Sequence, residues 1–169
     1  NFDIDSPVKR EYRFKISQNT LHQSVLSAPW SRNDAVLDLG ANDGLLAANI
    51  APLVGSITAV DIQKNEPKEG VKILQMDLNS NFDDILGREA YDKVIALDVI
   101  EHLNNPEAAI AKINNILKTG GKLYISTANV AFIIVRMALL LGWFNYGKKG
   151  ILDKTHHRLF TIKSFIRLL

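Results

Sequence analysis

The sequence predicts an α/β domain built on an open, mainly parallel sheet with helices on both faces. Two observations support this prediction. Short apolar segments typical of buried strands alternate along the chain with segments whose apolar residues recur at helical spacing. In addition, a turn with two glycines follows the first of these strands, at residues 40–44, and leads into a helical segment. The length of 169 residues is that of a single domain.

The first expected element is a helix within residues 12–30, where apolar residues lie at loosely helical spacing. Pro29 and the polar residues 31–34 interrupt this pattern. We therefore assign residues 1–34 to an N-terminal helical segment that precedes the sheet.

Residues 35–128 form the expected core of alternating strands and helices. Residues 45–53 are helix-like and are ended by Pro52 and Gly55. The clearest helix is 106–117, because Pro106 occupies its first turn and Gly120 and Gly121 follow its end. The expected strands are 35–39, 56–60, 71–76, 91–97 and 122–126.

Three carboxylates directly follow expected strands, namely Asp61, Asp77 and Asp98. The carboxyl ends of parallel strands meet at one edge of a sheet, and ligands bind there. Three acidic residues at that edge favour a ligand with several hydrogen-bond donors. For Asp77 an alternative is a purely local role as a turn residue or helix N-cap.

The turn at 40–44 indicates a nucleotide-type site, since glycine lets the backbone approach a ligand and expose helix N-terminal amides. A dinucleotide-binding fingerprint would also need glycine where the chain has Asn42 and Leu45, which argues against NAD. Asp61, at the end of the next strand, can accept hydrogen bonds from both hydroxyls of an unphosphorylated ribose. Ile62 and Leu78 would offer apolar faces to an adenine ring.

Taken together, these motifs resemble those of the class I S-adenosylmethionine-dependent methyltransferases, whose fold is Rossmann-like. The resemblance covers the chain from about residue 10 and includes segments 36–44, 92–103 and 117–126. It implies S-adenosylmethionine as cofactor and S-adenosylhomocysteine as product. The implied cofactor-binding residues are Asp38, Gly40, Asn42, Gly44, Asp61, Ile62, Asp77, Leu78 and Asp98. Asn42 stands where the family often has glycine.

The segment from Asn129 to Thr161 resembles a subgroup of small bacterial methyltransferases. That subgroup is frequently associated with sugar or cell-envelope metabolism and is related to quinone-biosynthetic O-methyltransferases. We expect residues 129–169 to form a truncated helical cap on the acceptor side, with the last strands of the family's usual seven missing. The expected acceptor-binding residues are Glu101, His102, Asn129, His156 and Arg158.

Methyl transfer to a hydroxyl needs a base, and histidine is the natural candidate. His102 follows the fourth expected strand and His156 lies in the subgroup pattern H-x-R-x-F-T, so both are predicted catalytic residues. For each, a structural role is an equally weighted alternative: loop packing for His102, and an ion pair with a cap of the following helix for the segment of His156 and Arg158. We expect no metal, because Glu101 beside Asp98 lacks further ligands.

The apolar segment 130–144 is shorter than a membrane span and contains Arg136 and Gly142. We expect it to pack on the core, with contact to an amphiphilic acceptor or a membrane surface as the alternative. The predicted function is methylation of a small acceptor on oxygen, on a sugar, glycan or quinone-type precursor. The alternatives are a module that binds the cofactor without turnover, and a nucleotide-dependent oxidoreductase.

Overall fold

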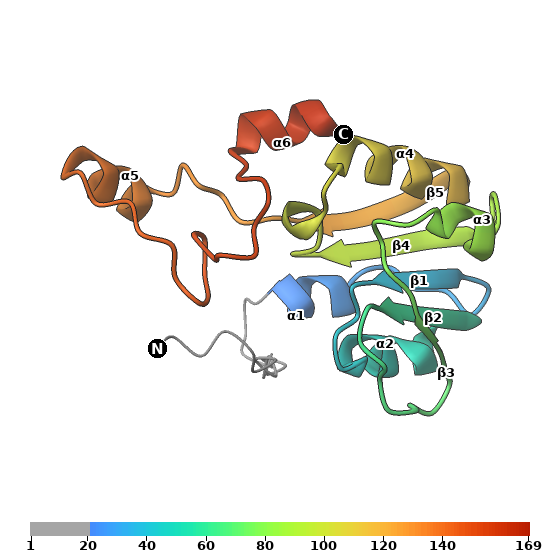
Figure 1. The fold of residues 1–169 in the computed structure, drawn as a ribbon. Helices are drawn as coiled ribbons and strands as arrows, with labels where there is room; N and C mark the ends of the chain where they lie inside the picture. Colours follow the sequence, from blue (N-terminus) through green and yellow to red (C-terminus); the bar gives the residue numbers. More distant parts are fainter. Residues whose placement is uncertain (1–20) are drawn as a thin grey trace.

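A computed structural model describes residues 21–169 of the chain (Figure 1). It contains one sheet in which every pairing is parallel and the strand order is β3-β2-β1-β4-β5. The strands are β1 (Ala35–Leu39), β2 (Ser56–Asp61), β3 (Val71–Gln75), β4 (Tyr91–Leu97) and β5 (Leu117–Ser126). The helices are α1 (Leu21–Leu26), α2 (Leu45–Ile50), α3 (Phe82–Leu86), α4 (Pro106–Ile116), α5 (Ile133–Leu140) and α6 (Ile162–Leu168), with short 3₁₀ turns η1 (Ala51–Leu53) and η2 (Ile100–His102). The predicted fold class is confirmed.

Strand β1 lies at the centre of the sheet, and all of its residues except Asp38 are apolar. Leu37 and Leu39 pack in one apolar cluster with α3 and α4, and α6 packs against that cluster. Val36 packs in a second cluster with α1 and α2, on the opposite face. Successive side chains of a strand alternate between faces, so the sheet is covered on both sides and residues at its carboxyl edge are left to form a site.

The chain moves from β1 outward to β3 and then returns to the other side of β1 as β4. Residue Val36 therefore pairs with Ile57 of β2 on one side and with Lys93 of β4 on the other. This reversal is the switch point at which open parallel sheets bind ligands.

The described strands follow the predicted ones closely, with one exception. Strand β5 begins at Leu117, directly after α4, and not at Lys122. Its register against β4 shifts between Tyr91 and Lys93, and this irregularity absorbs residues 118–121. At Gly121 a Cβ would lie 2.9 Å from the carbonyl oxygen of Lys118, so the bulge needs glycine there.

The expected helix at 12–30 is confirmed only in part. Residues 12–20 lie outside the described residues, and within the described part α1 ends at Leu26, three residues before Pro29. The indole nitrogen of Trp30 donates to the carbonyl oxygen of Val25, so a tight turn replaces the last predicted helical turn.

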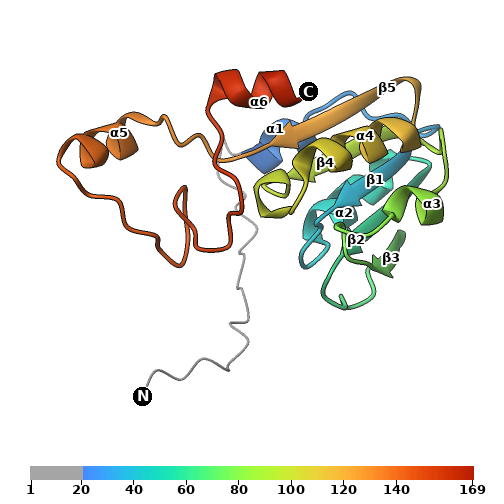
Figure 2. The same ribbon diagram turned by 45° about the horizontal axis from the view of Figure 1, so that its top comes forward.

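The C-terminal part leaves the sheet and comes back. Helix α5 stands apart from the sheet, whereas α6 returns to pack beside α4 (Figures 1 and 2). The buried side chain of Phe160 and a capping box between Thr161 and Ser164 hold the start of α6. The prediction that segment 130–144 packs on the core is wrong for most of its residues, because only Val135 of α5 is buried. No helix in the described part of the chain is long and apolar enough to cross a bilayer.

Candidate active site

A cavity of about 570 Å³ opens at the carboxyl ends of β1, β2 and β4. Its lining combines the predicted cofactor-binding residues with residues from α1, η2 and the segment before α6. Of the nine predicted cofactor-binding residues, all except Gly44 line it: Asp38, Gly40, Asn42, Asp61, Ile62, Asp77, Leu78 and Asp98. The fold thus gathers side chains that lie up to 60 positions apart in the sequence.

Asp38 is the most deeply buried carboxylate of the cavity lining, with 3% of its surface exposed. Its Oδ2 atom has no hydrogen-bond partner among the described residues. Burial, together with the nearby charge of Asp61, raises the pKa of Asp38 from 3.8 to about 7. A buried carboxyl with an unpaired oxygen is suited to a cationic ligand, whose charge would stabilise the ionised form.

The turn after β1 has a backbone that only a few residue types tolerate. Gly40 has a φ of +69°, and a Cβ at that position would lie 2.4 Å from the side chain of Val99. Asn42 also has a positive φ, of 48°. The backbone N–H of Asn42 donates to Oδ2 of Asp61 over 2.8 Å, and the backbone N–H of Gln63 donates to Oδ1 of Asp61. Asp61 therefore holds the turn in place and also faces the cavity.

Asp77 lies in a turn after β3. Its Oδ1 atom accepts hydrogen bonds from the backbone and side-chain nitrogens of Asn79, and its carbonyl oxygen accepts from Ser80. The local turn role that we considered for Asp77 is thus present, and the residue lines the cavity as well. Beside it, Leu78 is buried and Ile62 is 62% exposed, so these two residues give the cavity an apolar edge.

Asp98 follows β4 and is held by the end of β5. The hydroxyl of Ser126 donates to Oδ1 of Asp98 over 2.8 Å, and the amide of Asp98 donates to the carbonyl oxygen of Ser126. Its φ of 53° turns the chain sharply into η2. This turn brings His102, the last residue of η2, to the cavity.

His102 is oriented by a segment far along the chain. Its Nδ1 atom lies 3.0 Å from the carbonyl oxygen of Thr155. A carbonyl only accepts hydrogen bonds, so Nδ1 carries the proton and the Nε2 atom of the neutral ring has a free lone pair. The hydroxyl of Thr155 lies 3.1 Å from the same Nδ1 and donates to Oδ1 of Asp153 over 2.8 Å. The geometry leaves His102 able to take a proton through Nε2.

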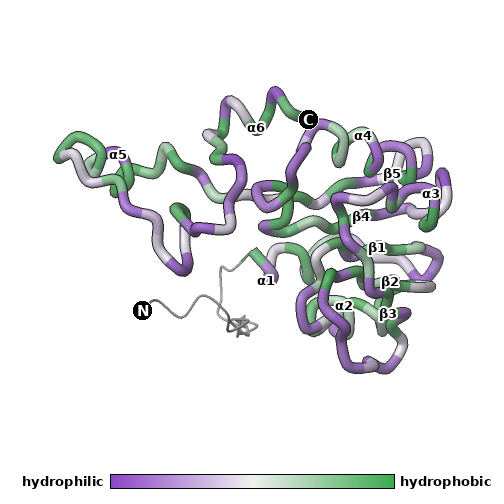
Figure 3. The backbone as a smooth tube through the Cα atoms, in the orientation of Figure 1, coloured by the Kyte–Doolittle hydropathy of each residue, from purple (hydrophilic) through white to green (hydrophobic). Residues whose placement is uncertain are grey.

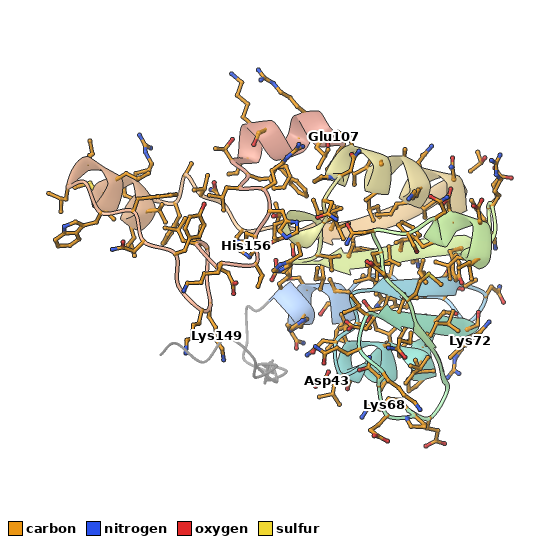
Figure 4. All side chains as sticks on the ribbon, in the orientation of Figure 1. Asp43, Lys68, Lys72, Glu107, Lys149 and His156 are labelled. Atoms are coloured by element: carbon orange, nitrogen blue, oxygen red, sulfur yellow. The ribbon has the colours of Figure 1, made fainter. Side chains whose placement is uncertain are left out.

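His156, the other predicted base, is not among the residues that line the cavity. Its Nδ1 atom lies 3.0 Å from the carbonyl oxygen of Ile151, and its ring packs edge-on against that of His102 at 4.8 Å between centroids. Arg158 pairs with Glu107 at the exposed start of α4 (Figure 4 labels His156 and Glu107). The ion pair and the capped helix that we considered for this segment are both present.

Glu101 and Asn129, two of the predicted acceptor-binding residues, are not among the residues that line the cavity. Glu101 is 1% exposed, and its Oε1 atom accepts from the amide of Ala128. Its carbonyl oxygen accepts from the amides of His157 and Arg158, so this residue ties η2 to the segment before α6. The Oδ1 atom of Asn129 accepts a hydrogen bond from the backbone N–H of Ala131, and the backbone of Asn129 forms an isolated parallel β-bridge with Phe160. Within residues 21–169, no cluster of three potential metal ligands is found.

Several lining residues were not predicted from the sequence. His22 reaches the cavity from α1, and Lys154, Thr155 and His157 reach it from the segment before α6. The H-x-R-x-F-T pattern pointed to that segment but to His156 in place of its neighbour His157. For His22 no local signal exists, because its position depends on how α1 packs on the sheet.

Comparison with known proteins gives the same assignment for the family and the fold. A family model described as a methyltransferase domain matches residues 10–169. The ubiquinone biosynthesis O-methyltransferase of Rickettsia canadensis is 32% identical over 161 residues, which cover 85% of this chain and 64% of that protein. The mitochondrial ubiquinone biosynthesis O-methyltransferase of Dictyostelium discoideum is 30% identical over 147 residues, which cover 76% of this chain and 44% of that protein. The chain thus spans about half the length of the curated relatives it matches.

Among solved structures, a SAM-dependent methyltransferase from Archaeoglobus fulgidus superposes with a TM-score of 0.64 at 15% sequence identity. The alignment covers 87% of this chain and 66% of the other. At this identity the likeness concerns the fold, and it agrees with the sheet described above.

Proposed function

Because this chain belongs to the class I S-adenosylmethionine-dependent methyltransferases, we propose that it transfers a methyl group from S-adenosylmethionine to an oxygen atom of a small acceptor. The observation that supports this most strongly is the gathering of eight predicted cofactor-binding residues around one cavity that His102 also lines. A site that has both cofactor-binding residues and a candidate base suits a reaction between two ligands. A module that only binds the cofactor would not need the base.

The residues of the cavity fit the chemistry of this cofactor. Asp38 offers its unpaired, buried Oδ2 atom to the positively charged methionine end. Asp61 lies at the end of β2 and lines the cavity, where a ribose hydroxyl can donate to it. Ile62 and Leu78 offer apolar contacts to the adenine ring, and Asp77 offers an acceptor to its amino group. Because Gly40 has no side chain, its backbone is open to a ligand in the cavity.

His102 would act as the general base of the reaction. When bound, S-adenosylmethionine supplies an electrophilic methyl group on a sulfonium. The Nε2 atom of His102 takes the proton of the acceptor hydroxyl, and Thr155 holds the ring by accepting from Nδ1. Thr155 in turn is fixed by its hydrogen bonds to Asp153. His156 would support the ring of His102 by edge-on packing.

For the acceptor we propose a hydroxylated, quinone-type precursor. Two similar proteins are named ubiquinone biosynthesis O-methyltransferases. In addition, the acceptor side of the cavity carries Lys154, Thr155 and His157. Lys154 offers a cation and the ring of His157 offers a hydrogen-bonding nitrogen, which suit a hydroxylated ring or its anionic substituent.

The cofactor is tested by calorimetric titration of the folded protein with S-adenosylmethionine and S-adenosylhomocysteine. We expect micromolar binding of both, corresponding to about −8 kcal/mol, and its loss in Asp61→Ala. Asp84→Ala, which removes an exposed carboxylate from α3, is the control. Tighter binding of NAD than of S-adenosylmethionine by a folded sample would contradict the proposal.

The acceptor is tested by transfer of radioactive methyl from S-adenosylmethionine to a catechol, as a soluble probe of a quinone-type ring, and to a monosaccharide. Methylation of the catechol but not of the sugar supports the proposed acceptor. Methylation of the sugar alone would replace it, and cofactor binding without transfer to either would favour the binding module.

A further inference from the structure

Residues 132–149, named here the lobe, form the largest group of exposed apolar side chains in the described structure. Within residues 132–146, ten large apolar side chains are at least 44% exposed: Phe132, Ile133, Ile134, Met137, Leu139, Leu140, Leu141, Trp143, Phe144 and Tyr146. Figure 3 shows this apolar character along α5, which Figures 1 and 2 show standing away from the sheet. Soluble domains rarely expose so continuous an apolar surface unless another surface covers it.

The charge around the lobe has one sign. Residues 129–169 contain seven Lys and Arg against the single Asp153, whereas residues 1–128 contain 13 against 17 Asp and Glu. No acidic residue occurs between Glu107 and Asp153. The net charge of +2 for the whole chain therefore conceals a basic C-terminal part and an acidic remainder. Arg136, Lys148 and Lys149 of the lobe are all exposed.

We propose that the lobe binds to the surface of a lipid bilayer that contains anionic lipids. Exposed Leu, Ile and Phe side chains can enter the boundary of the acyl chains, and Trp143 and Tyr146 have the amphipathic rings that prefer the headgroup level. Lys148 and Lys149 follow directly and can contact anionic headgroups. The helix is too short to span the bilayer, so this is binding to the surface.

Charge favours a lipid surface over a second copy of the chain. Two lobes facing each other would bring Arg136, Lys148 and Lys149 of both copies together with no acidic partner in either lobe. A nucleic acid would satisfy these charges but would leave the ten apolar side chains exposed to water. An anionic bilayer accommodates both features.

The lobe is continuous with the acceptor side of the cavity. The chain runs from Lys149 directly to Lys154, Thr155 and His157, which line the cavity. If the proposed function holds, an apolar acceptor dissolved in the bilayer would be close to His102 when the lobe is bound. Binding to lipid itself does not depend on the proposed function, and the test below uses neither cofactor nor acceptor.

The test is flotation of the protein with vesicles of phosphatidylcholine alone and of phosphatidylcholine mixed with phosphatidylglycerol. We expect binding to the mixed vesicles that weakens with salt. The double variant Lys148→Glu/Lys149→Glu should bind at least about tenfold more weakly, since each basic residue near an anionic surface contributes about 1 kcal/mol, or about fivefold. Lys72→Glu, at an exposed position of β3 far from the lobe, should bind like the parent (Figure 4).

The apolar contribution has a closely matched control. Ile134 and Ile85 are 68% and 67% exposed, but only Ile134 belongs to the lobe. We expect Ile134→Ser to weaken binding and Ile85→Ser to leave it unchanged. In Trp30→Phe, where Trp143 is the remaining tryptophan, fluorescence emission should shift to shorter wavelength when mixed vesicles are added.

Three outcomes would overturn the proposal. The first is absence of binding by the folded parent. The second is equal binding of the parent and the lobe variants. The third is a parent that self-associates in sedimentation, is made monomeric by Ile134→Ser, and does not bind vesicles, which would assign the lobe to contact between copies.

Discussion

The Nδ1 atom of His102 lies 3.0 Å from the carbonyl oxygen of Thr155, a residue 53 positions further along the chain. This contact determines which ring nitrogen of the neutral histidine has a free lone pair, and it joins η2 to the segment that carries the lobe. The orientation of the proposed base therefore depends on that segment as well as on β4.

Replacement of His102 by Asn should separate the two roles of the ring. The amide of Asn can still donate to Thr155 from a position close to that of Nδ1, but no base replaces Nε2. We expect kcat for methyl transfer to fall by about 10²-fold or more, with little change in cofactor affinity. His156→Asn is the control and should retain most of the activity. Equal losses in both variants, measured in steady-state kinetics, would remove the assignment of His102 as base.

Asp61→Asn should weaken binding of S-adenosylmethionine while the fold persists. The side-chain oxygen of the new Asn can still accept from the backbone N–H of Asn42, but its NH₂ group cannot accept from Gln63, and the charge that would attract ribose hydroxyls is lost. Hydrogen bonds to a charged group contribute about 1.5–3 kcal/mol, so the affinity should fall by about tenfold to 100-fold in calorimetry. Asp84→Asn makes the same change on α3 and should bind as the parent does. Unchanged affinity in Asp61→Asn would place the ribose elsewhere.

The raised pKa of Asp38 predicts how stability depends on pH. In the folded state the carboxyl keeps its proton up to about pH 7, whereas the unfolded chain releases it near 3.8. The folded state thus binds more protons between these values, and the contribution of Asp38 to stability is complete below 3.8 and is lost as the pH rises through about 7. Asp38→Asn should lack this loss. In urea unfolding, its free energy of unfolding should therefore increase relative to that of the parent as the pH rises. A constant difference would show that the pKa is not raised.

The same carboxyl predicts the pH dependence of cofactor binding. Above its pKa of about 7, Asp38 is negatively charged and attracts the cationic end of S-adenosylmethionine, whereas below it the carboxyl is neutral. Affinity in the parent should therefore rise with pH across this value, whereas the affinity of Asp38→Asn should be nearly constant and lower than that of the parent above it. Titration calorimetry at several pH values checks both. A parent whose affinity does not change with pH would argue against contact between Asp38 and the cation.

Gly40→Ala should destabilise the protein through a specific clash. The added Cβ would lie 2.4 Å from Val99 on a backbone with a φ of +69°. Gly120→Ala isolates the cost of the backbone conformation, since Gly120 has a φ of +80° and nothing within 4 Å of its Cβ position. We expect Gly40→Ala to cost about 1–3 kcal/mol more than the control in urea unfolding, and Val99→Ala to restore part of the loss. Equal costs would mean that the clash relaxes freely.

Local patterns in the sequence determined most of the sheet and most of the cofactor-binding residues of the site. Three of the predicted strands are short apolar runs that are followed directly by Asp61, Asp77 or Asp98. Each run and its Asp lie within a few residues of each other, so a local pattern is enough to find them. The carboxyl ends of parallel strands must meet at one edge, so the gathering of these three residues around one cavity followed from the fold class, whereas Asp38 was predicted from the family resemblance.

Only the tertiary structure decided the acceptor side of the cavity and the exposure of the lobe. Which of His156 and His157 reaches the cavity depends on a long segment anchored by Glu101, whose hydrogen bonds join parts of the chain that no periodicity connects. An apolar helix pattern likewise shows that a helix has residues to cover, but not what covers them. The sheet does not cover the apolar residues of α5, because the chain leaves the sheet at Asn129 and returns only at Phe160.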